Sequence, residues 1–225
     1  MFDAHRHLSS DTSSFANAIY ATASIGQWQQ AAALSTSVCI GAGALANEPL
    51  PTAEDLYTHL VAHPALQVGE VGLDRRYPDS AAQEDFLRDA ITIASELDRL
   101  LILHVVRRDG RAIELLRSFG STLPRVLWHG CTASVESRKI LAKLGVIVSY
   151  GPTLFESAIA RDPATLCVGQ WVLESDWERK DEEAYGAFYG EHVHAFATLT
   201  GLSVERVVKN NDAIRAILTD QPPPR

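Results

Sequence analysis

The sequence contains few cysteines and none in a metal-knuckle arrangement. Its three cysteines, Cys39, Cys131 and Cys167, are odd in number and widely spaced, with no Cys-x-x-Cys pair. This pattern excludes a disulfide framework and a zinc knuckle, and it predicts reduced thiols that are mostly buried in strands.

Long apolar runs and an excess of positive charge are missing as well. No run approaches the roughly 18 apolar residues that span a bilayer, and His5 and Arg6 interrupt the N-terminal stretch where a secretory signal would be apolar. We therefore expect a cytoplasmic protein without membrane contact. The formal net charge of −8 argues against a protein that coats nucleic acid with a basic face. It permits an enzyme that holds phosphate through metal ions and local arginines.

Short apolar runs are abundant, and eight of them alternate with segments of helical periodicity. The predicted strands are residues 2–8, 18–23, 37–43, 66–72, 100–106, 125–129, 146–150 and 171–176. The predicted helices are residues 26–34, a helix that Thr52 starts and Pro64 follows, and residues 80–98, 110–119, 135–144, 154–160, 182–200 and 204–218.

This alternation predicts a parallel α/β fold, because continuous runs of Val, Ile and Leu suit strands buried on both faces. Eight units in 225 residues fit a compact (β/α)8 TIM-type barrel. Residues 9–14 form a polar loop too short for a full helix, so the first βα unit is shortened. An open doubly wound sheet is the alternative, but no glycine-rich phosphate loop follows the first strand. Residues 1–220 are expected to form one domain and 221–225 a frayed tail.

The first predicted strand carries a His-x-His motif. Residues two apart on a strand share a face, so Asp3, His5 and His7 are expected to line one side. Two imidazoles held there can bind one divalent ion. Alone, the motif is weak, and its weight depends on where other ligand-type residues fall.

Four such residues close other predicted strands. Glu70 ends the fourth strand, His104 the fifth, His129 the sixth and Asp176 the eighth. Each alone fits a structural role as a core histidine, a loop acid or a helix cap. Together with the His-x-His pair they gather at the face where barrel active sites form. Burying them there is costly without a shared compensating charge, which points to metal.

Four histidines and two carboxylates exceed the needs of one tetrahedral ion with an open position. They fit two divalent ions that share a bridging carboxylate and clamp a hydroxide between them. Such a hydroxide is a nucleophile at neutral pH. It suits hydrolysis of a phosphodiester or an amide.

The same residues carry a family resemblance that spans nearly the whole chain. The matching motifs are Asp3-Ala4-His5-Arg6-His7-Leu8, Gly69-Glu70-Val71-Gly72-Leu73-Asp74, His104, His129, Glu174-Ser175-Asp176 and Asn210-Asn211-Asp212-Ala213. With these motifs the sequence resembles the TatD family of metal-dependent deoxyribonucleases, within the amidohydrolase superfamily. The combination of His-x-His with Gly-Glu-x-Gly-Leu-Asp is specific.

The resemblance implies a role for each ligand-type residue. One ion would be held by His5, His7 and Asp176, the second by His104 and His129, and Glu70 would bridge the two. Asp176 would also orient or deprotonate the attacking water. Mg²⁺ or Mn²⁺ would be the working ions, although sites rich in histidine also take Zn²⁺ or Ni²⁺.

Three further acids are candidates for supporting roles. Asp3 is expected to orient an imidazole or to be a plain polar core residue. Glu174 shares a strand face with Asp176 and is expected to position it, and Asp74 is expected to anchor the loop after the fourth strand.

Arginines gather near the proposed metals: Arg6, then Arg75 and Arg76 after the fourth strand, and Arg107 and Arg108 after the fifth. Guanidinium groups suit phosphate oxygens, so these residues are candidate clamps for a substrate backbone. The alternative is that they are solvated loop residues paired with nearby acids.

The sequence departs from the family pattern at the expected substrate pocket. Gly41–Gly43 stand where the family usually has His-Pro, and Val106 stands where it usually has an arginine, which here follows as Arg107. Trp177 and Glu178 follow Asp176, where the family favours a small residue and proline. These departures alter the expected substrate pocket and leave the residues expected to bind metal intact.

The first functional hypothesis is a dinuclear phosphodiesterase that trims single strands or ends of DNA. The second is a hydrolase of the same superfamily that acts on a small amide, lactone or phosphoester. Such relatives often bridge their metals with a carbamylated lysine, and none of the four lysines here closes a predicted strand, which favours a bridging glutamate. The third is a non-catalytic metal-bound scaffold. We expect a monomer with no obligate protein partner.

Overall fold

Eight parallel strands form one continuous sheet in the computed structural model, which describes residues 1–8, 17–179 and 181–219. The strands are β1 (Asp3–His7), β2 (Ala18–Ala21), β3 (Cys39–Ala42), β4 (Gln67–Asp74), β5 (Leu101–Val106), β6 (Val126–Trp128), β7 (Ile147–Tyr150) and β8 (Trp171–Leu173). Each strand pairs with the next along the chain, in the order β1 to β8. This order is that of a (β/α)8 barrel and not of a doubly wound sheet.

The ring closes just beyond β8. The amide of Asp176 donates a hydrogen bond to the carbonyl oxygen of His5 at 3.1 Å, and the amide of His7 donates to the carbonyl oxygen of Trp177 at 3.1 Å. The eighth predicted strand therefore ends its pairing with β7 early and continues as a seam against β1. The predicted TIM-type barrel is confirmed.

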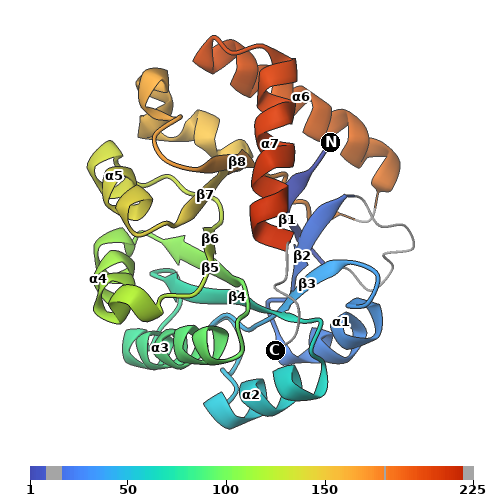
Figure 1. Cartoon of the computed structure of the whole chain (residues 1–225), viewed down its shortest axis with the longest axis vertical. Helices are drawn as coiled ribbons and strands as arrows, with labels where there is room; N and C mark the ends of the chain where they lie inside the picture. Colours follow the sequence, from blue (N-terminus) through green and yellow to red (C-terminus); the bar gives the residue numbers. More distant parts are fainter. Residues whose placement is uncertain (9–16, 180, 220–225) are drawn as a thin grey trace.

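The helices surround the sheet on its outer side (Figure 1). They are α1 (Trp28–Leu34), α2 (Ala53–Ala62), α3 (Ser80–Glu96), α4 (Asp109–Phe119), α5 (Val135–Lys143), α6 (Glu182–Thr200) and α7 (Val204–Thr219), with short 3₁₀ turns at η1 (Ile25–Gln27) and η2 (Gly120–Thr122). The predicted polar loop at 9–14 and the tail at 221–225 lie outside the described residues. No helix in the described ranges has the length and apolar character needed to cross a membrane.

One predicted helix is wrong. Residues 154–160 belong to a series of 3₁₀ turns, η3 (Pro152–Glu156), η4 (Ala158–Arg161) and η5 (Pro163–Thr165). Ser157 between the first two has extended backbone angles, and a proline opens the first and third turns. The extended backbone of Ser157 interrupts the helical conformation inside the segment, so the segment breaks into single turns.

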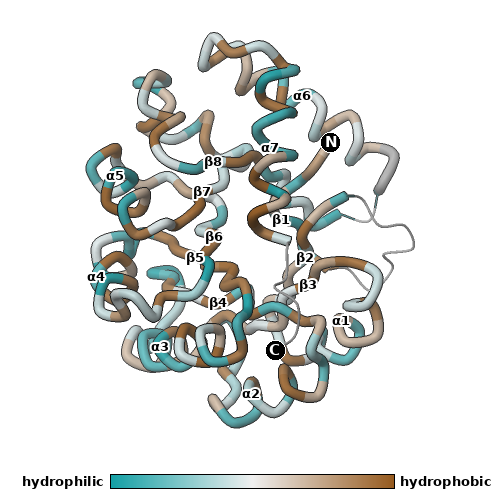
Figure 2. Tube along the Cα trace, in the orientation of Figure 1, coloured by the Kyte–Doolittle hydropathy of each residue, from teal (hydrophilic) through white to brown (hydrophobic). Residues whose placement is uncertain are grey.

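The barrel interior is apolar on the N-terminal side of the face where the strands end. Hydrophobic residues lie along strands β5 and β8 (Figure 2). Because side chains on a strand alternate, the residue two positions before each inner polar residue also points inward. The resulting pairs are Ile102 and His104, Leu127 and His129, Ile147 and Ser149, and Val172 and Glu174. A layer of polar groups therefore rests on an apolar layer that excludes water from below.

Helix α7 ties the first and last strands together. The Asn211 side chain accepts a hydrogen bond from the Leu173 amide at 3.2 Å and donates to the carbonyl oxygen of Phe2 at 3.2 Å. Asn210 donates to the carbonyl oxygen of Trp171 at 2.7 Å. The Asn-Asn motif of the sequence therefore anchors the helix across the barrel seam and fixes β1 beside β8.

Candidate metal centre

A single buried carboxylate stands at the middle of the C-terminal face. Glu70 of β4 has Oε1 at 2.6 Å from His104 Nδ1 and at 2.7 Å from His129 Nε2. Its other oxygen, Oε2, lies 3.7 Å from His5 Nε2 and 4.0 Å from His7 Nδ1. One carboxylate thus faces four imidazoles, two on each oxygen.

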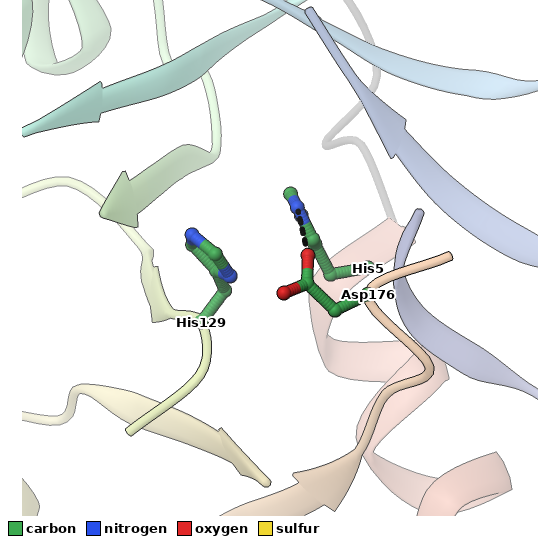
Figure 3. A group of neighbouring side chains, drawn as sticks. All are labelled: His5, His129 and Asp176. Atoms are coloured by element: carbon green, nitrogen blue, oxygen red, sulfur yellow. Dashed lines mark ion pairs between the residues drawn. The ribbon is translucent and has the colours of Figure 1, made fainter. Parts of the chain in front are cut away.

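Asp176 supplies a second carboxylate across the cluster. Its Oδ1 lies 3.1 Å from His7 Nε2 and 3.6 Å from His5 Nε2. Figure 3 shows His5 and Asp176 joined by this ion pair, with His129 opposite them. The rings of His5 and His129 stack with centroids 4.0 Å apart. Asp176 has the left-handed φ of 51°, which aspartate adopts more readily than most residues, and this turn aims its side chain at the histidines.

Several polar atoms of the cluster are buried and have no hydrogen-bond partner among the described residues. They are both ring nitrogens of His5, Oε2 of Glu70 and Nδ1 of His129. Buried polar atoms are rarely left unsatisfied, because the desolvation cost is not recovered. Three groups of ligand atoms lie within 4.8 Å of one another: His5, His7 and Glu70; Glu70, His104 and His129; and His5, His129 and Asp176. Divalent cations fit this donor set and would satisfy the orphaned atoms.

The charges of the cluster are set by burial and by mutual contact. Burial opposes ionisation of Glu70, but His129 and the hydrogen-bonded His104 hold its pKa well below the ordinary value. Burial likewise opposes ionisation of Asp176, whose pKa is nevertheless lowered, chiefly by the hydrogen bond to His7. Both carboxylates are therefore anionic at neutral pH, as metal ligands must be.

The histidines divide into two kinds. Burial, reinforced by His129, drives the pKa of His5 well below 6.5, so this ring is neutral. Burial also disfavours the charged forms of His129 and His7, but Glu70 raises the pKa of the first and Asp176 that of the second. The metal-free cluster is thus held together by protons on His7 and His129.

A family comparison decides what kind of protein this is. The family model for TatD related DNase matches residues 27–216, which is most of the chain. The chain belongs to the TatD-related DNase family. It is accordingly a metal-dependent hydrolase of the TatD family, with a His, Glu and Asp cluster that can hold metal.

Solved structures agree with this TatD-family assignment at the level of the fold. A TatD homologue from Escherichia coli K12 superposes with a TM-score of 0.79 and 18% identity, over 98% of each chain. A TatD-family hydrolase from Entamoeba histolytica reaches 0.71 at 11% identity, over 89% of this chain and 83% of that one. An uncharacterized amidohydrolase from Saccharomyces cerevisiae reaches 0.59 at 14% identity, over 89% and 88%. A search of curated protein sequences finds no match.

We predict that metal binding to this TatD-family protein releases protons. His7 and His129 have raised pKa values in the metal-free protein, and each must be neutral to ligate. Calorimetric titration with Mn²⁺ in buffers of different ionisation enthalpy should show release of more than one proton per chain near pH 6.5, because each ring is more than half protonated there. The affinity for Mn²⁺ should rise with pH. At pH values below the raised pKa values both imidazoles are protonated, and a protonated imidazole cannot bind the ion.

A His7→Gln variant should release about one proton fewer, and His63→Gln, outside the cluster, should behave as wild type. Binding without proton release would contradict the assigned protonation states.

The same protonation states affect the stability of the metal-free fold. Because the pKa of His129 is raised, its pairing with Glu70 is stabilising below pH 6.5 and is lost as pH rises through the folded-state pKa.

Two of the three supporting acids contact histidines of the candidate metal centre. Asp74 Oδ2 lies 3.1 Å from His104 Nε2, so it can orient that ring as well as the loop that follows β4. Glu174 has Oε1 at 3.6 Å from His129 Nδ1, and Ser149 donates a short hydrogen bond to its Oε2. From its place on the eighth predicted strand, Glu174 is expected to position Asp176. Its contacts instead place it behind His129.

Asp3 was expected on the same face as His5, and this is wrong. The pairing of β1 with β2 shifts register between Asp3 and Arg6, so a β-bulge breaks the alternation of side chains. Asp3 accepts hydrogen bonds from the amides of His5 and Ser175 at 3.2 and 2.9 Å and from the Tyr185 hydroxyl at 3.0 Å. Burial raises its pKa to about 7, against these hydrogen bonds. Asp3 fixes the backbone at the barrel seam and does not orient an imidazole.

Arg6 is not placed to clamp phosphate. Its side chain is buried, donates to the Tyr20 hydroxyl at 3.2 Å and lies with its guanidinium carbon 3.8 Å from the centre of the Tyr185 ring. Strand alternation places Arg6 on the outer face, toward Tyr185 of α6, while its neighbours His5 and His7 face Glu70. A guanidinium stacked between two aromatic rings is a structural element of the seam.

The remaining arginines lie in the loops after β4 and β5. Arg76 is bound to Asp74, with Nε at 2.9 Å from Oδ2, and so supports the carboxylate that orients His104. Arg75 and Arg107 are exposed, and Arg108 is the residue before α4. These three stay predictions as phosphate contacts.

Ser149 was missed by the sequence analysis. It lies on β7, is fully buried, and its hydroxyl binds Glu174 behind His129. The signal that could have found it is a lone hydroxyl inside an apolar strand, two residues after Ile147 and so on the inner face.

Proposed function

We propose that this protein is a dinuclear metal-dependent phosphodiesterase that acts on DNA, at single strands or strand ends. The observation that carries the proposal is the position of Glu70, which belongs to two overlapping groups of ligand atoms. One carboxylate oxygen faces His5 and His7, and the other faces His104 and His129. This arrangement supports two ion positions with a common carboxylate.

The assignment of residues to the two ions is the one that the family resemblance implies. The Glu70 contacts support it, as do the distances of 3.1 and 3.6 Å from Asp176 Oδ1 to the Nε2 atoms of His7 and His5. His5, His7 and Asp176 would hold one ion, His104 and His129 the other, and Glu70 would belong to both. Mg²⁺ or Mn²⁺ would serve, and the four imidazoles also suit Zn²⁺ or Ni²⁺. When bound, such ions supply Lewis acidity toward the phosphoryl group and make water a nucleophile at neutral pH.

Asp176 is the residue we assign to the attacking water. It is anionic, because its pKa is lowered, and its side chain is 36% exposed, unlike the buried Glu70. It can therefore accept a hydrogen bond from water at the mouth of the barrel and orient or deprotonate it. Arg75, Arg107 and Arg108 would hold the substrate's phosphates.

A small-molecule hydrolase is the second candidate, and Glu178 favours it. The Glu178 carboxylate is 73% exposed and lies 3.5 Å from His7 Nε2, at the entrance to the centre. A negative charge there disfavours a long polyanion and favours a small amide, lactone or phosphoester.

The deciding experiment is hydrolysis of end-labelled single-stranded DNA with Mg²⁺, Mn²⁺ or EDTA, beside a His5→Ala variant. We expect shortening that needs metal and that the variant lacks. Intact DNA together with two bound metals per chain would overturn the DNase proposal and favour the small-molecule candidate. Intact DNA with no bound metal would overturn both.

A further inference from the structure

A pocket of about 320 Å³ adjoins the metal centre on the side of Asp176. Its walls are the segment from Ser175 to Arg179, together with Thr153 and Phe188. Three of these residues, Trp177, Glu178 and Arg179, follow Asp176 in the segment where the sequence departs from the family pattern. We call this space the Asp176 pocket.

The wall of the Asp176 pocket is held rigidly by the barrel seam. The Trp177 carbonyl oxygen accepts a hydrogen bond from the His7 amide, and the Trp177 amide donates to Ser175 Oγ at 3.2 Å. The Trp177 ring is buried against Phe188 and Tyr185, with centroids 5.1 and 5.9 Å away. The pocket is therefore preformed, with aromatic rings in its wall.

Two opposite charges line the pocket side by side. Glu178 Oε1 lies 3.5 Å from His7 Nε2, the same nitrogen that Asp176 approaches at 3.1 Å. The guanidinium carbon of Arg179 lies 5.6 Å from the centre of the Trp177 ring. The wall thus presents a hydrogen-bond acceptor, Glu178, beside a donor, Arg179.

We propose that the Asp176 pocket binds a planar heterocycle that carries adjacent N–H and C=O groups, the chemistry of a nucleobase edge. The N–H faces Glu178, the C=O faces Arg179, and the ring lies against the aromatic wall. A free phosphate is a poor occupant, because Glu178 and Asp176 repel it. This inference rests on the proposed hydrolysis at the adjoining metal centre.

The size of the pocket limits what it accepts. Pockets for small molecules usually measure roughly 300–1,000 Å³, so 320 Å³ suits one ring system with its attached sugar. A single base at a strand end therefore fits, whereas a duplex does not. A small cyclic amide also carries adjacent N–H and C=O groups. The heterocycle could therefore come from a nucleotide or from a free cyclic amide.

The test compares two phosphodiesters that share a leaving group. One is the 4-nitrophenyl ester of thymidine monophosphate, and the other is the same ester of an abasic deoxyribose phosphate. The wild type should prefer the base-bearing ester in kcat/KM by about tenfold. Arg179→Met should remove most of this preference. Glu178→Gln should lower it too, but Arg179 is the cleaner variant because Glu178 also lies beside His7.

Matched controls are Glu156→Gln and Arg161→Met, two exposed residues on the neighbouring 3₁₀ turns. Both should keep the wild-type preference. Equal kcat/KM for the two esters in the wild type, or an unchanged preference in Arg179→Met, would overturn the inference.

A binding measurement separates this inference from the proposed function. If neither ester is hydrolysed, calorimetric titration of the Mn²⁺-loaded protein with thymidine still tests the pocket. Binding that Arg179→Met weakens about tenfold would support the pocket while the DNase proposal fails, and no binding would overturn the pocket as well. Hydrolysis of dihydrouracil, with both esters intact, would identify a small cyclic amide as the source of the heterocycle.

Discussion

Asp176→Asn lowers kcat of the metal-loaded protein by about 10³-fold, within the range typical for loss of a general base. Asparagine keeps the size of the side chain, and it also adopts the left-handed backbone that Asp176 occupies at φ 51°. The substitution removes the negative charge that lies 3.1 Å from His7 and 3.6 Å from His5. The amide cannot accept a proton from water, so the loss falls on the chemical step.

The measurement is kcat with bis(4-nitrophenyl) phosphate as substrate, together with metal content by elemental analysis. Asp181→Asn is a matched control, because Asp181 lies five residues further on and its Oδ1 caps α6 by accepting from the Ala184 amide. Asparagine caps helices as well as aspartate does, so activity and melting temperature should not change. If Asp176→Asn keeps more than about a tenth of the wild-type kcat with metal bound, Asp176 is not the base.

Most strands of the barrel were predictable because they lie in apolar runs. For example, the predicted strands 100–106 and 146–150 each begin one residue before the observed β5 (Leu101–Val106) and β7 (Ile147–Tyr150) and end at the same residue. Strand ends were predicted too long, as at 171–176. Pairing with β7 ends at Leu173, and the following residues pair with β1. This pairing joins residues far apart in the sequence, so local composition does not predict it.

Local helix signals also succeeded where a side chain completes the cap. Thr52 was predicted to start a helix, and it forms a capping box with Asp55 in front of α2. The prediction for 154–160 failed because nothing in its local sequence indicates the extended backbone of Ser157, which separates its two turns. The N-terminal cap of a helix depends on about four consecutive residues and can be predicted from them. A series of single 3₁₀ turns depends on tertiary packing, which the local sequence does not show.

The candidate ligands were predictable for a geometric reason. Parallel strands end on one face, so polar residues at the ends of apolar runs meet there, as His104 and His129 do at 2.9 Å between ring nitrogens. The error at Asp3 arises from the β-bulge between Asp3 and Arg6. A bulge adds a residue without changing composition, so strict alternation assigned Asp3 to the face of His5 and His7. Arg6 falls on the opposite face by alternation alone, and its nearness in sequence to the candidate ligands did not predict its burial against Tyr20 and Tyr185.

At Gly41–Gly43, where the sequence departs from the family pattern, the end of β3 lies close against the backbone of Glu70. The missing imidazole at the end of β3 was expected to alter the substrate pocket. A Cβ atom built on Gly43 would lie 2.3 Å from the carbonyl oxygen of Glu70 and 2.5 Å from its amide nitrogen. No side chain fits there. The glycine lets the end of β3 pass against the backbone of Glu70.

Gly43→Ala should therefore destabilise the fold and disturb the metal centre together. The backbone of Glu70 has little freedom to yield, because its amide donates to the Thr22 carbonyl oxygen at 2.9 Å, and Thr22 Oγ1 accepts from the Gly43 amide at 2.9 Å. Overpacking of this kind costs on the order of 3 kcal/mol, and for a chain of this length that lowers Tm by about 10 °C. Displacing Glu70 also weakens Mn²⁺ binding, since the carboxylate faces both groups of histidines.

The matched control is Gly186→Ala in α6, where, among the described residues and apart from the adjoining backbone of the helix, no atom lies within 4 Å of the added Cβ. Alanine has the higher helix propensity, so this variant should melt at or slightly above the wild-type temperature. Thermal unfolding with and without Mn²⁺ compares the two. A Gly43→Ala protein with wild-type Tm would show that β3 can move away from Glu70. A lowered Tm with unchanged Mn²⁺ affinity would show that the strand end supports the fold without setting the position of the carboxylate.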